Sequence, residues 1–173
     1  MRVIMAVLAL FLVGSVASAS TATPAQVRAP GAIPNSDGAA VLSAIRVGSH
    51  PGHDRVVFEF DGALPTYHAV YVDQVTRDGS GEPVSLRGNA FLQLTMHNAT
   101  LDNSFQVTDP RDVRRYEGPR RIATPGLPLV RELAEAGDFE ADLTFGIGID
   151  RQTPFRVLLL TSPTRVVVDF SHG

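Results

Sequence analysis

Short segments that alternate apolar and polar residues recur from Ser43 to the end of the chain, separated by Gly, Pro, Asp and Asn. The clearest segment is Arg55–Asp61, in which Val56, Phe58 and Phe60 alternate with mostly polar residues. Because successive side chains of a strand point to opposite faces of a sheet, this pattern predicts a strand with one buried face and one wet face.

Two later stretches strengthen the all-β interpretation. Residues Ala141–Asp150 alternate along their length and predict a long strand, whose glycines Gly146 and Gly148 mark a bulge or a close backbone neighbour. Phe155–Leu160 and Arg165–Phe170 are separated by a short segment that contains a proline, and they predict a hairpin.

The remaining strand candidates are shorter or less regular: Ile45–Gly48, Tyr67–Val75, Phe91–Met96 and Val130–Ala134. The segment 127–136 fits an alternating strand and also fits helical turns; we favour the strand, with a single helical turn as the alternative. About eight strands separated by turns predict a sandwich or a closed barrel.

Two strand sequences echo each other, DRVVFEF at 54–60 and TRVVVDF at 164–170. A single echo does not make a repeat architecture. It indicates that two strands share the same one-sided burial, as two central strands of facing or paired sheets would.

The N-terminal part of the chain has a different character. Residues 1–19 combine Arg2, an apolar run and small residues before Ser20, which is the pattern of a cleaved secretory signal peptide. The alternative is a membrane anchor, but the apolar run is shorter than the roughly 20 residues that span a bilayer. Residues 20–41 are rich in Pro, Ala, Ser and Thr and predict a flexible spacer, which leaves 42–171 as one domain.

Composition removes several classes of chemistry. The chain has 173 residues, no cysteine and a net charge of −3. The lack of cysteine excludes disulfides, zinc ribbons, iron–sulfur clusters and lipid attachment at an N-terminal Cys. All 15 Lys or Arg side chains are Arg, which excludes Schiff-base and P-loop lysine chemistry. The mildly acidic balance argues against nucleic acid as a partner.

Three stretches together resemble a known family: IRVGSHPGHDRVVFEFDG at 45–62, the segment 116–157, which ends in GIGIDRQTPFRV, and SPTRVVVDF at 162–170. They are similar to the AMIN-like domain of actinobacterial exported proteins and lipoproteins, which is distantly similar to the AMIN domains of cell-wall amidases and pilus secretins. The resemblance implies a β-sandwich of about eight mostly antiparallel strands over 42–171. It also implies a domain that binds or localises at the cell envelope without catalysis. The chain has no lipobox Cys and no accompanying catalytic module, so the resemblance implies neither membrane tethering nor amidase activity.

His50, His53 and Asp54 form the strongest cluster of metal-ligand types in the chain. Two His residues at this spacing converge on a metal only if the loop at Pro51 and Gly52 curls through one turn. Because no third His or Cys has a suitable spacing, we favour the alternative, a turn between two strands whose side chains cap the following strand. We therefore expect no metal and no other cofactor.

The segment RRYEGPRR at 114–121 is the only dense basic run of the chain. Arginine binds carboxylates and phosphates through parallel hydrogen bonds, so this basic run is the predicted contact for an anionic wall polymer or for an acidic face of an envelope protein. The predicted ligand-binding residues are Arg114, Arg115, Tyr116, Arg120 and Arg121. The alternative is an exposed loop whose arginines pair with Asp109, Asp112 and Glu117.

The sequence shows no credible catalytic constellation. Ser80 lies in DGSGEP rather than in GxSxG, and the GxG at 146–148 is not followed by a helix. The acids available for a glycosidase pair are ordinary solvated strand positions: Glu132, Glu135, Asp138, Glu140 and Asp142.

The sequence therefore predicts an exported, extracytoplasmic protein, secreted or associated with the cell wall. Its function would be that of a non-catalytic module that binds cell-wall polymer or an envelope protein. The alternatives are a hydrolase acting on wall glycan or peptide and an interaction protein that never touches wall polymer. We expect no nucleic-acid partner and no membrane span in the mature form.

Overall fold

The computed structural model describes residues 27–28 and 38–173; residues 1–26 and 29–37 lie outside this description. The described residues form strands and loops, with one short 3-10 turn, η1, at Pro110–Asp112. The strands are β1 (Val27–Arg28), β2 (Ala40–His50), β3 (His53–Asp61), β4 (Thr66–Val72), β5 (Ala90–His97), β6 (Ala99–Thr100), β7 (Arg121–Ala123), β8 (Val130–Phe139), β9 (Asp142–Ile149), β10 (Phe155–Thr161) and β11 (Thr164–Ser171).

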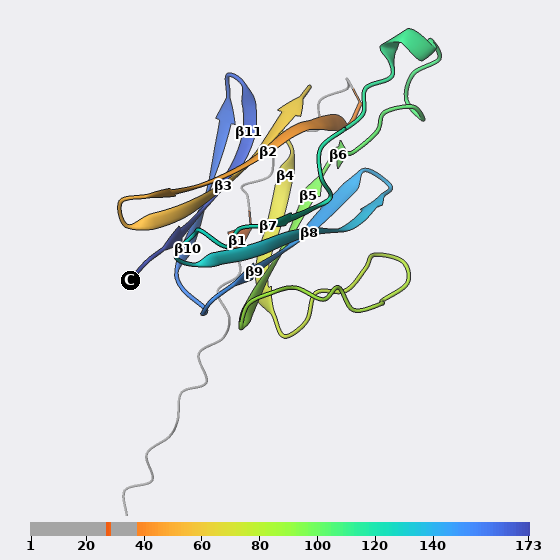
Figure 1. The fold of residues 1–173 in the computed structure, drawn as a ribbon. Helices are drawn as coiled ribbons and strands as arrows, with labels where there is room; N and C mark the ends of the chain where they lie inside the picture. The colour runs from red at the N-terminus through yellow and green to blue at the C-terminus, as the bar shows by residue number, and fades with distance from the viewer. Residues whose placement is uncertain (1–26, 29–37) are drawn as a thin grey trace, which may run out of the picture.

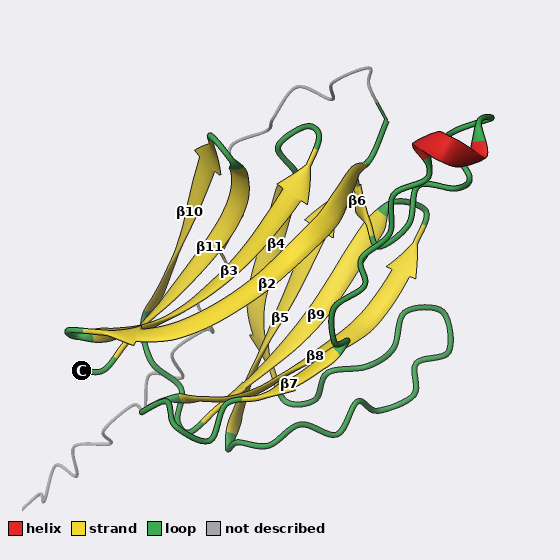
Figure 2. Cartoon of the chain, turned by 45° about the horizontal axis from the view of Figure 1, so that its top comes forward, coloured by secondary structure: helices red, strands yellow, loops and turns green. Residues whose placement is uncertain are grey.

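The strands form two sheets that pack face to face (Figure 1). Sheet A has the order β1-β4-β5-β9-β8-β7, and sheet B has the order β10-β11-β3-β2-β6. Neighbouring strands are antiparallel except β2 and β6, which are parallel. Figure 2 shows the two layers, with η1 at the tip of an excursion that projects away from them. The predicted β-sandwich is confirmed, and the closed-barrel alternative is wrong because the two sheets stay separate.

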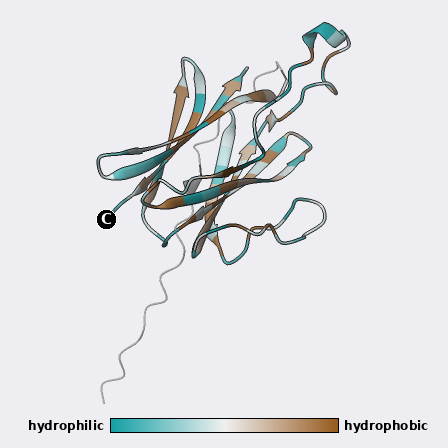
Figure 3. Cartoon of the chain, viewed as in Figure 1, coloured by the Kyte–Doolittle hydropathy of each residue, from teal (hydrophilic) through white to brown (hydrophobic). Residues whose placement is uncertain are grey.

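Apolar side chains from the inner faces of both sheets fill the space between the layers. Phe58 of β3 and Phe145 of β9 contact each other across this core, with ring centroids 5.1 Å apart and planes inclined by 55°. As predicted, Val56, Phe58 and Phe60 are all buried. Figure 3 shows the resulting change between hydrophobic and hydrophilic residues along the strands.

The two echoing segments lie side by side in sheet B. β3 and β11 pair antiparallel, with Val56 opposite Val168 and Phe58 opposite Val166. The echo thus marks two neighbouring inner strands of one sheet, whereas the prediction assigned them to two facing or paired sheets. β10 and β11 form the predicted hairpin.

Two sequence-based boundaries differ from the structure. The segment 127–136 contributes most of β8, so the helical-turn alternative is wrong. β4 ends at Val72, whereas the predicted strand continued to Val75. Val75 instead packs against the outer face of sheet A, together with Val84 and Ala134, because the chain folds back over the sheet after β4.

The segment 73–89 covers part of the outer face of sheet A, and the glycines of β9 make room for it. A Cβ atom at Gly148 would overlap the carbonyl oxygen of Arg87, and one at Gly146 would crowd Val75 and Leu86. The prediction of a close backbone neighbour is therefore confirmed at Gly148, whereas the close neighbours of Gly146 are side chains. The segment is held at its base by the backbone N–H of Arg87, which donates to Oε2 of Glu132 over 2.9 Å.

The domain starts slightly earlier than predicted. β2 begins at Ala40, and both Ala40 and Val41 are buried, whereas the expected boundary was residue 42. Within the predicted spacer, Val27–Arg28 forms β1, which pairs with β4. The predicted signal peptide at 1–19 and the other spacer residues before 38 lie outside the described residues. In the described part of the chain, no helix is long and apolar enough to cross a membrane.

Candidate functional site

His50 and His53 lie on either side of the turn that joins β2 to β3. Pro51 and Gly52 form this turn, and the φ of +83° at Gly52 is one that glycine adopts readily. The two imidazole rings stack, with centroids 5.0 Å apart. Asp54 follows His53 on β3, so its side chain points to the opposite face and is fully buried. The three metal-ligand candidates do not converge, and the residues that the structure describes contain no cluster of three such side chains.

Asp54 joins the two sheets instead. Its Oδ2 accepts hydrogen bonds from the backbone N–H groups of Leu129 (2.7 Å) and Val130 (3.0 Å), and Nε2 of His172 donates to its Oδ1 over 2.9 Å. Burial raises the pKa of Asp54, but the hydrogen bonds from His172 and the two backbone groups outweigh burial and leave the pKa below its ordinary value. Asp54 is therefore a structural carboxylate whose acceptor positions are taken.

The arginines of the basic run at 114–121 are largely engaged with acids of the same molecule. Their partners differ from those expected, because the run lies beside β8 and the segment after β6, which supply other carboxylates. The pairs are Arg115 with Asp102, Arg120 with Glu135 at 3.9 Å, and Arg121 with Glu132 at 3.0 Å. Asp109, one of the expected partners, pairs with Arg111.

Arg114 and Tyr116 complete the basic run and differ in exposure. Arg114 is exposed and lines a hollow of about 700 Å³ together with Asp61 and Asp112. Tyr116 is buried among core side chains, and its hydroxyl donates to the carbonyl of Pro119. The prediction of Tyr116 as a ligand-binding residue is wrong, because its ring is not available at the surface.

A charged row crosses the outer face of sheet B, on three adjacent strands. Asp169 of β11 lies directly between Arg55 of β3 and Arg156 of β10. Arg55 donates to both carboxylate oxygens, with Nε 2.6 Å from Oδ1 and Nη2 2.8 Å from Oδ2. Arg156 donates from Nε to Oδ2 over 2.9 Å. One carboxylate therefore serves two guanidinium groups, and one positive charge of the row has no counter-charge within it.

The surroundings of Asp169 are strongly cationic. Hydrogen bonds from Arg55 lower the pKa of Asp169 to about 2, with Arg156 acting in the same direction and burial opposing both. His53 also faces this carboxylate, with its Nε2 3.6 Å from Oδ1 of Asp169. This nitrogen is buried and has no hydrogen-bond partner among the described residues. A buried nitrogen without a partner is uncommon, and it lies beside open space.

That open space is a hollow of about 330 Å³ at the edge of sheet B. Its lining combines the turn at Gly52, His53 and the charged row with the chain that enters β10: Gly52, His53, Pro154, Phe155, Arg156, Asp169 and Ser171. The side chain of Arg156 is 64% exposed, so its guanidinium is accessible from solvent. The hollow therefore offers the exposed guanidinium of Arg156, beside the His53 ring and the apolar side chains of Pro154 and Phe155.

The outer face of sheet B continues this positive character. We define it by the outward-facing positions of β2, β3, β10 and β11, which alternate with the core residues of these strands. Its charged residues are Arg46, Arg55, Arg156 and Arg165 against Glu59, Asp169 and, at one end, Asp61. Arg46 lies 3.5 Å from Glu59, and the guanidinium of Arg165 donates to the carbonyl of Pro163. A cationic surplus thus sits on a chain whose net charge is −3.

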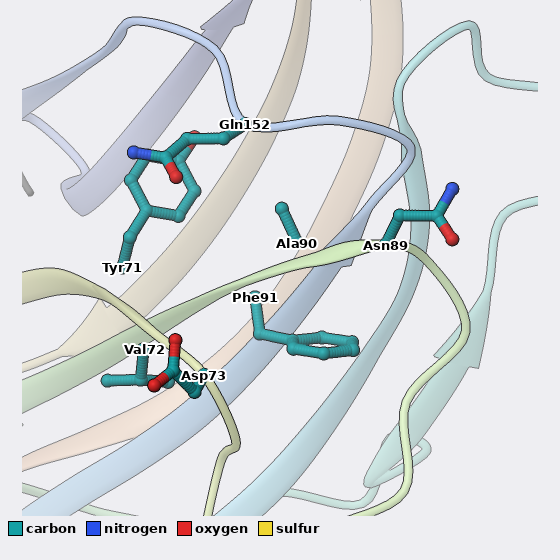
Figure 4. Close-up of a pocket in the computed structure, with 7 residues that line it drawn as sticks. All are labelled: Tyr71, Val72, Asp73, Asn89, Ala90, Phe91 and Gln152. Atoms are coloured by element: carbon teal, nitrogen blue, oxygen red, sulfur yellow. The ribbon is translucent and has the colours of Figure 1, made fainter. Parts of the chain in front are cut away.

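A second hollow, of about 380 Å³, lies where β4 ends and β5 begins (Figure 4). Its lining is less suited to a charged ligand, because Asp73 is its one ionised group. The Tyr71 hydroxyl is already used, since it donates to the carbonyl of Thr153 over 2.7 Å. This hollow contains no pair of groups able to act together on a substrate.

Comparison with known proteins assigns the domain. The AMIN-like domain family matches residues 40–172, which run from the start of β2 to the residue after β11. The chain belongs to the AMIN-like domain family. Searches of curated proteins and of solved structures returned no significant match.

Reasoning from the sequence missed the charged row of this AMIN-like domain, although a signal was present. The echoing segments contain RVVFE at 55–59 and RVVVD at 165–169. When two such segments pair antiparallel, the arginine of each falls opposite the acid of the other. The register shows this, with Arg55 opposite Asp169 and Arg165 opposite Glu59. Arg156 comes from the preceding strand and had no such signal.

Proposed function

We propose that this AMIN-like domain is an extracytoplasmic, non-catalytic module that binds an anionic component of the cell envelope and localises the protein there. Membership of the family supports a binding or localisation role associated with the cell wall. Two classes of component have the required chemistry, namely wall polymers that carry phosphate or carboxylate groups and envelope proteins with an acidic face. The proposal includes export directed by residues 1–19.

The observation that carries the proposal is the sharing of Asp169 between Arg55 and Arg156. A guanidinium that shares its carboxylate keeps N–H donors for a second anion, and its planar fork suits carboxylate and phosphate groups. The ring of His53 lines the same hollow as Arg156, and its Nε2 lies buried 3.6 Å from Oδ1 of Asp169. An anionic group of the ligand would be bound at this hollow.

The basic run at 114–121 is a second surface for the same function. Each of Arg115, Arg120 and Arg121 has a carboxylate partner, so an external anion would have to compete with an existing ion pair. Arg114 is the member of the run that faces a hollow. The outer face of sheet B is better supported, because there the number of arginines exceeds the number of carboxylates.

The proposal is tested by co-sedimentation of residues 20–173 with purified cell-wall sacculi, prepared with and without wall-linked anionic polymers. We expect binding that weakens as salt rises, because exposed charges are screened beyond about 8 Å at physiological ionic strength. Arg156→Ala with Arg165→Ala should weaken binding about tenfold, which corresponds to ~1.4 kcal/mol for the loss of charge-assisted hydrogen bonds.

The matched control is Arg120→Ala with Arg121→Ala, which removes the same charge from the other surface. Binding by this control should be unchanged. The free energy of unfolding of both double variants should equal that of the wild type to within about 1 kcal/mol. Loss of binding only in the control would move the contact to the basic run. No binding by the wild type to either preparation, or to a solubilised envelope protein fraction, would refute the proposed function.

A further inference from the structure

β10 is an open edge of sheet B. It pairs with β11 on one side, and no described residue pairs with its other side. The other strands that end the two sheets are short: β1 and β6 have two residues each and β7 has three, whereas β10 has seven. A long edge strand presents a row of backbone N–H and C=O groups that can pair with another strand.

β10 has few of the usual protections of an edge strand. Its sequence, FRVLLLT, contains no proline, and its register with β11 is unbroken, so no bulge bends it away. Its one charged residue is Arg156. Leu160 is 37% exposed and is one of three large hydrophobic side chains that the described residues expose. The edge is therefore long, regular and apolar.

We propose that a second copy of this chain pairs with this edge, β10 to β10 and antiparallel, about a two-fold axis at Leu158. The two five-stranded sheets B would then form one continuous sheet. Opposite residues in this register would be Phe155 and Thr161, Arg156 and Leu160, Val157 and Leu159, and the two copies of Leu158. Antiparallel pairing keeps residues of the same face together, so core-side Val157 meets core-side Leu159.

Length and charge point to a second copy as the occupant. Centring the axis on Leu158 lets the whole of Phe155–Thr161 pair, and a shift of the axis by one residue leaves two residues unpaired at one end of each strand. The central register also sets Arg156 opposite Leu160, so the two positive charges do not face each other. A two-fold interface of this kind uses the same surface on both chains, which is the commonest arrangement of soluble dimers.

The pairing would join the two charged rows. Arg156 lies on both the edge strand and the outer face of sheet B, so the cationic faces of the two copies would become one surface. A polymer with repeated anionic groups could then contact both copies, which raises the overall affinity without any new contact. The dimer itself does not rest on the proposed function, since its formation requires no envelope ligand.

Single cysteines test the register, because the chain has none of its own. In residues 20–173, Leu158→Cys should form a disulfide-linked dimer under mild oxidation. The two Cα atoms at the axis would be about 4.5–5.5 Å apart, within the range that a disulfide bridges. Leu160→Cys is the control, since its two copies would be separated by roughly 13 Å along the strand. Equal cross-linking at both positions, or none at Leu158→Cys, would refute this register.

Sedimentation equilibrium tests the dimer without cross-linking. The wild type should be dimeric in a concentration-dependent way, and Leu160→Lys should shift it to monomer while keeping the far-ultraviolet circular dichroism of the folded wild type. Phe139→Lys places the same charge on another exposed apolar side chain, at the β8–β9 turn, and should leave the dimer intact. A monomeric wild type, or dissociation by Phe139→Lys alone, would overturn the proposal. Loss of wall binding with an intact dimer would contradict only the proposed function.

Discussion

Arg55 and Asp169 occupy directly opposite positions on β3 and β11 and are joined by two hydrogen bonds, of 2.6 and 2.8 Å. Asp169 is 3% exposed, whereas the side chain of Arg55 is 31% exposed. The pair therefore links the surface of sheet B to an ionised carboxylate that is almost inaccessible to water. The stabilising effect of the pair therefore depends on that carboxylate staying ionised.

The first prediction concerns acid. The pKa of Asp169 is lowered from 3.8 to about 2 in the folded protein. Its contribution to stability is therefore fully present above pH 4 and is lost as the pH falls through 2. Asp169→Asn should lower the free energy of unfolding at pH 7 by about 2 kcal/mol, and this difference from the wild type should shrink between pH 4 and pH 2. Urea unfolding at several pH values measures it; a difference that stays constant over this range would contradict the prediction.

The second prediction concerns the contact between the sheets. Phe58→Ala should lower the free energy of unfolding by about 3–5 kcal/mol, because it removes a buried ring that packs against Phe145. Phe139→Ala is the control, since Phe139 is 64% exposed and its loss should change stability by less than about 0.5 kcal/mol. Denaturant unfolding measures both variants. An unchanged midpoint for Phe58→Ala would mean that the core is packed differently.

The third prediction compares a crowded strand glycine, Gly148, with an uncrowded one, Gly48. Gly148→Ala should displace the segment 73–89, because the added Cβ overlaps the carbonyl of Arg87. We expect a loss of about 1–3 kcal/mol, typical of overpacking, and faster tryptic cleavage after Arg77 or Arg87. Gly48→Ala adds the same atom where nothing lies within 4 Å, and it should be neutral or slightly stabilising. Equal effects of the two changes would show that the segment does not rest on β9.

The sequence predicts the strands of this fold better than it predicts the site. Alternation identified β3 because burial on one face leaves a direct period-two pattern. The β10–β11 hairpin was identified by two apolar runs on either side of a short segment that contains a proline. The predicted strand extended to Val75, beyond the end of β4 at Val72. The reason is that Val75 is also buried, but against the outer face of the same sheet. A second buried surface under a loop has the same hydropathy as a strand and cannot be distinguished from it by pattern.

The site was harder to predict because partners are set by folding over long separations. The sequence indicates that RRYEGPRR is basic, but the acids that neutralise it come from Asp102, Glu132 and Glu135, on other elements. Tyr116 looks like an exposed member of a polar run, and only the packing of the sandwich shows that it is a core residue. Local charge density alone therefore indicated a surface on which three of the four arginines already have carboxylate partners.

The fourth prediction concerns catalysis. Residues 20–173 should not cleave peptidoglycan or wall peptides between pH 5 and pH 8, with or without added zinc. The reason is that His53 lies on the opposite face of β3 from Asp54, and Ser80 lies at an exposed loop tip. Release of soluble fragments from labelled sacculi is the measurement. Turnover that disappears with His53→Ala would make the protein a hydrolase.

The fifth prediction concerns export. Expression of the full chain in a secreting bacterial host should yield an extracellular protein that begins at Ser20. The expectation follows from the small residues Ala17 and Ala19 after a short apolar run. N-terminal sequencing measures it, and Ala19→Leu should block processing at this bond. An extracellular protein that still begins at Met1 would refute cleavage.

The position of β11 sets the order in which the molecule can assemble. It is the last strand along the chain, yet it lies inside sheet B between β10 and β3. Until 164–171 have been synthesised, β3 lacks a neighbour on one side and Asp54 lacks His172. Folding must therefore wait for the final strand, and the many contacts between distant residues make it slow. Under the export proposed above, such a delay would keep the chain unfolded during translocation, and the sandwich would close only afterwards.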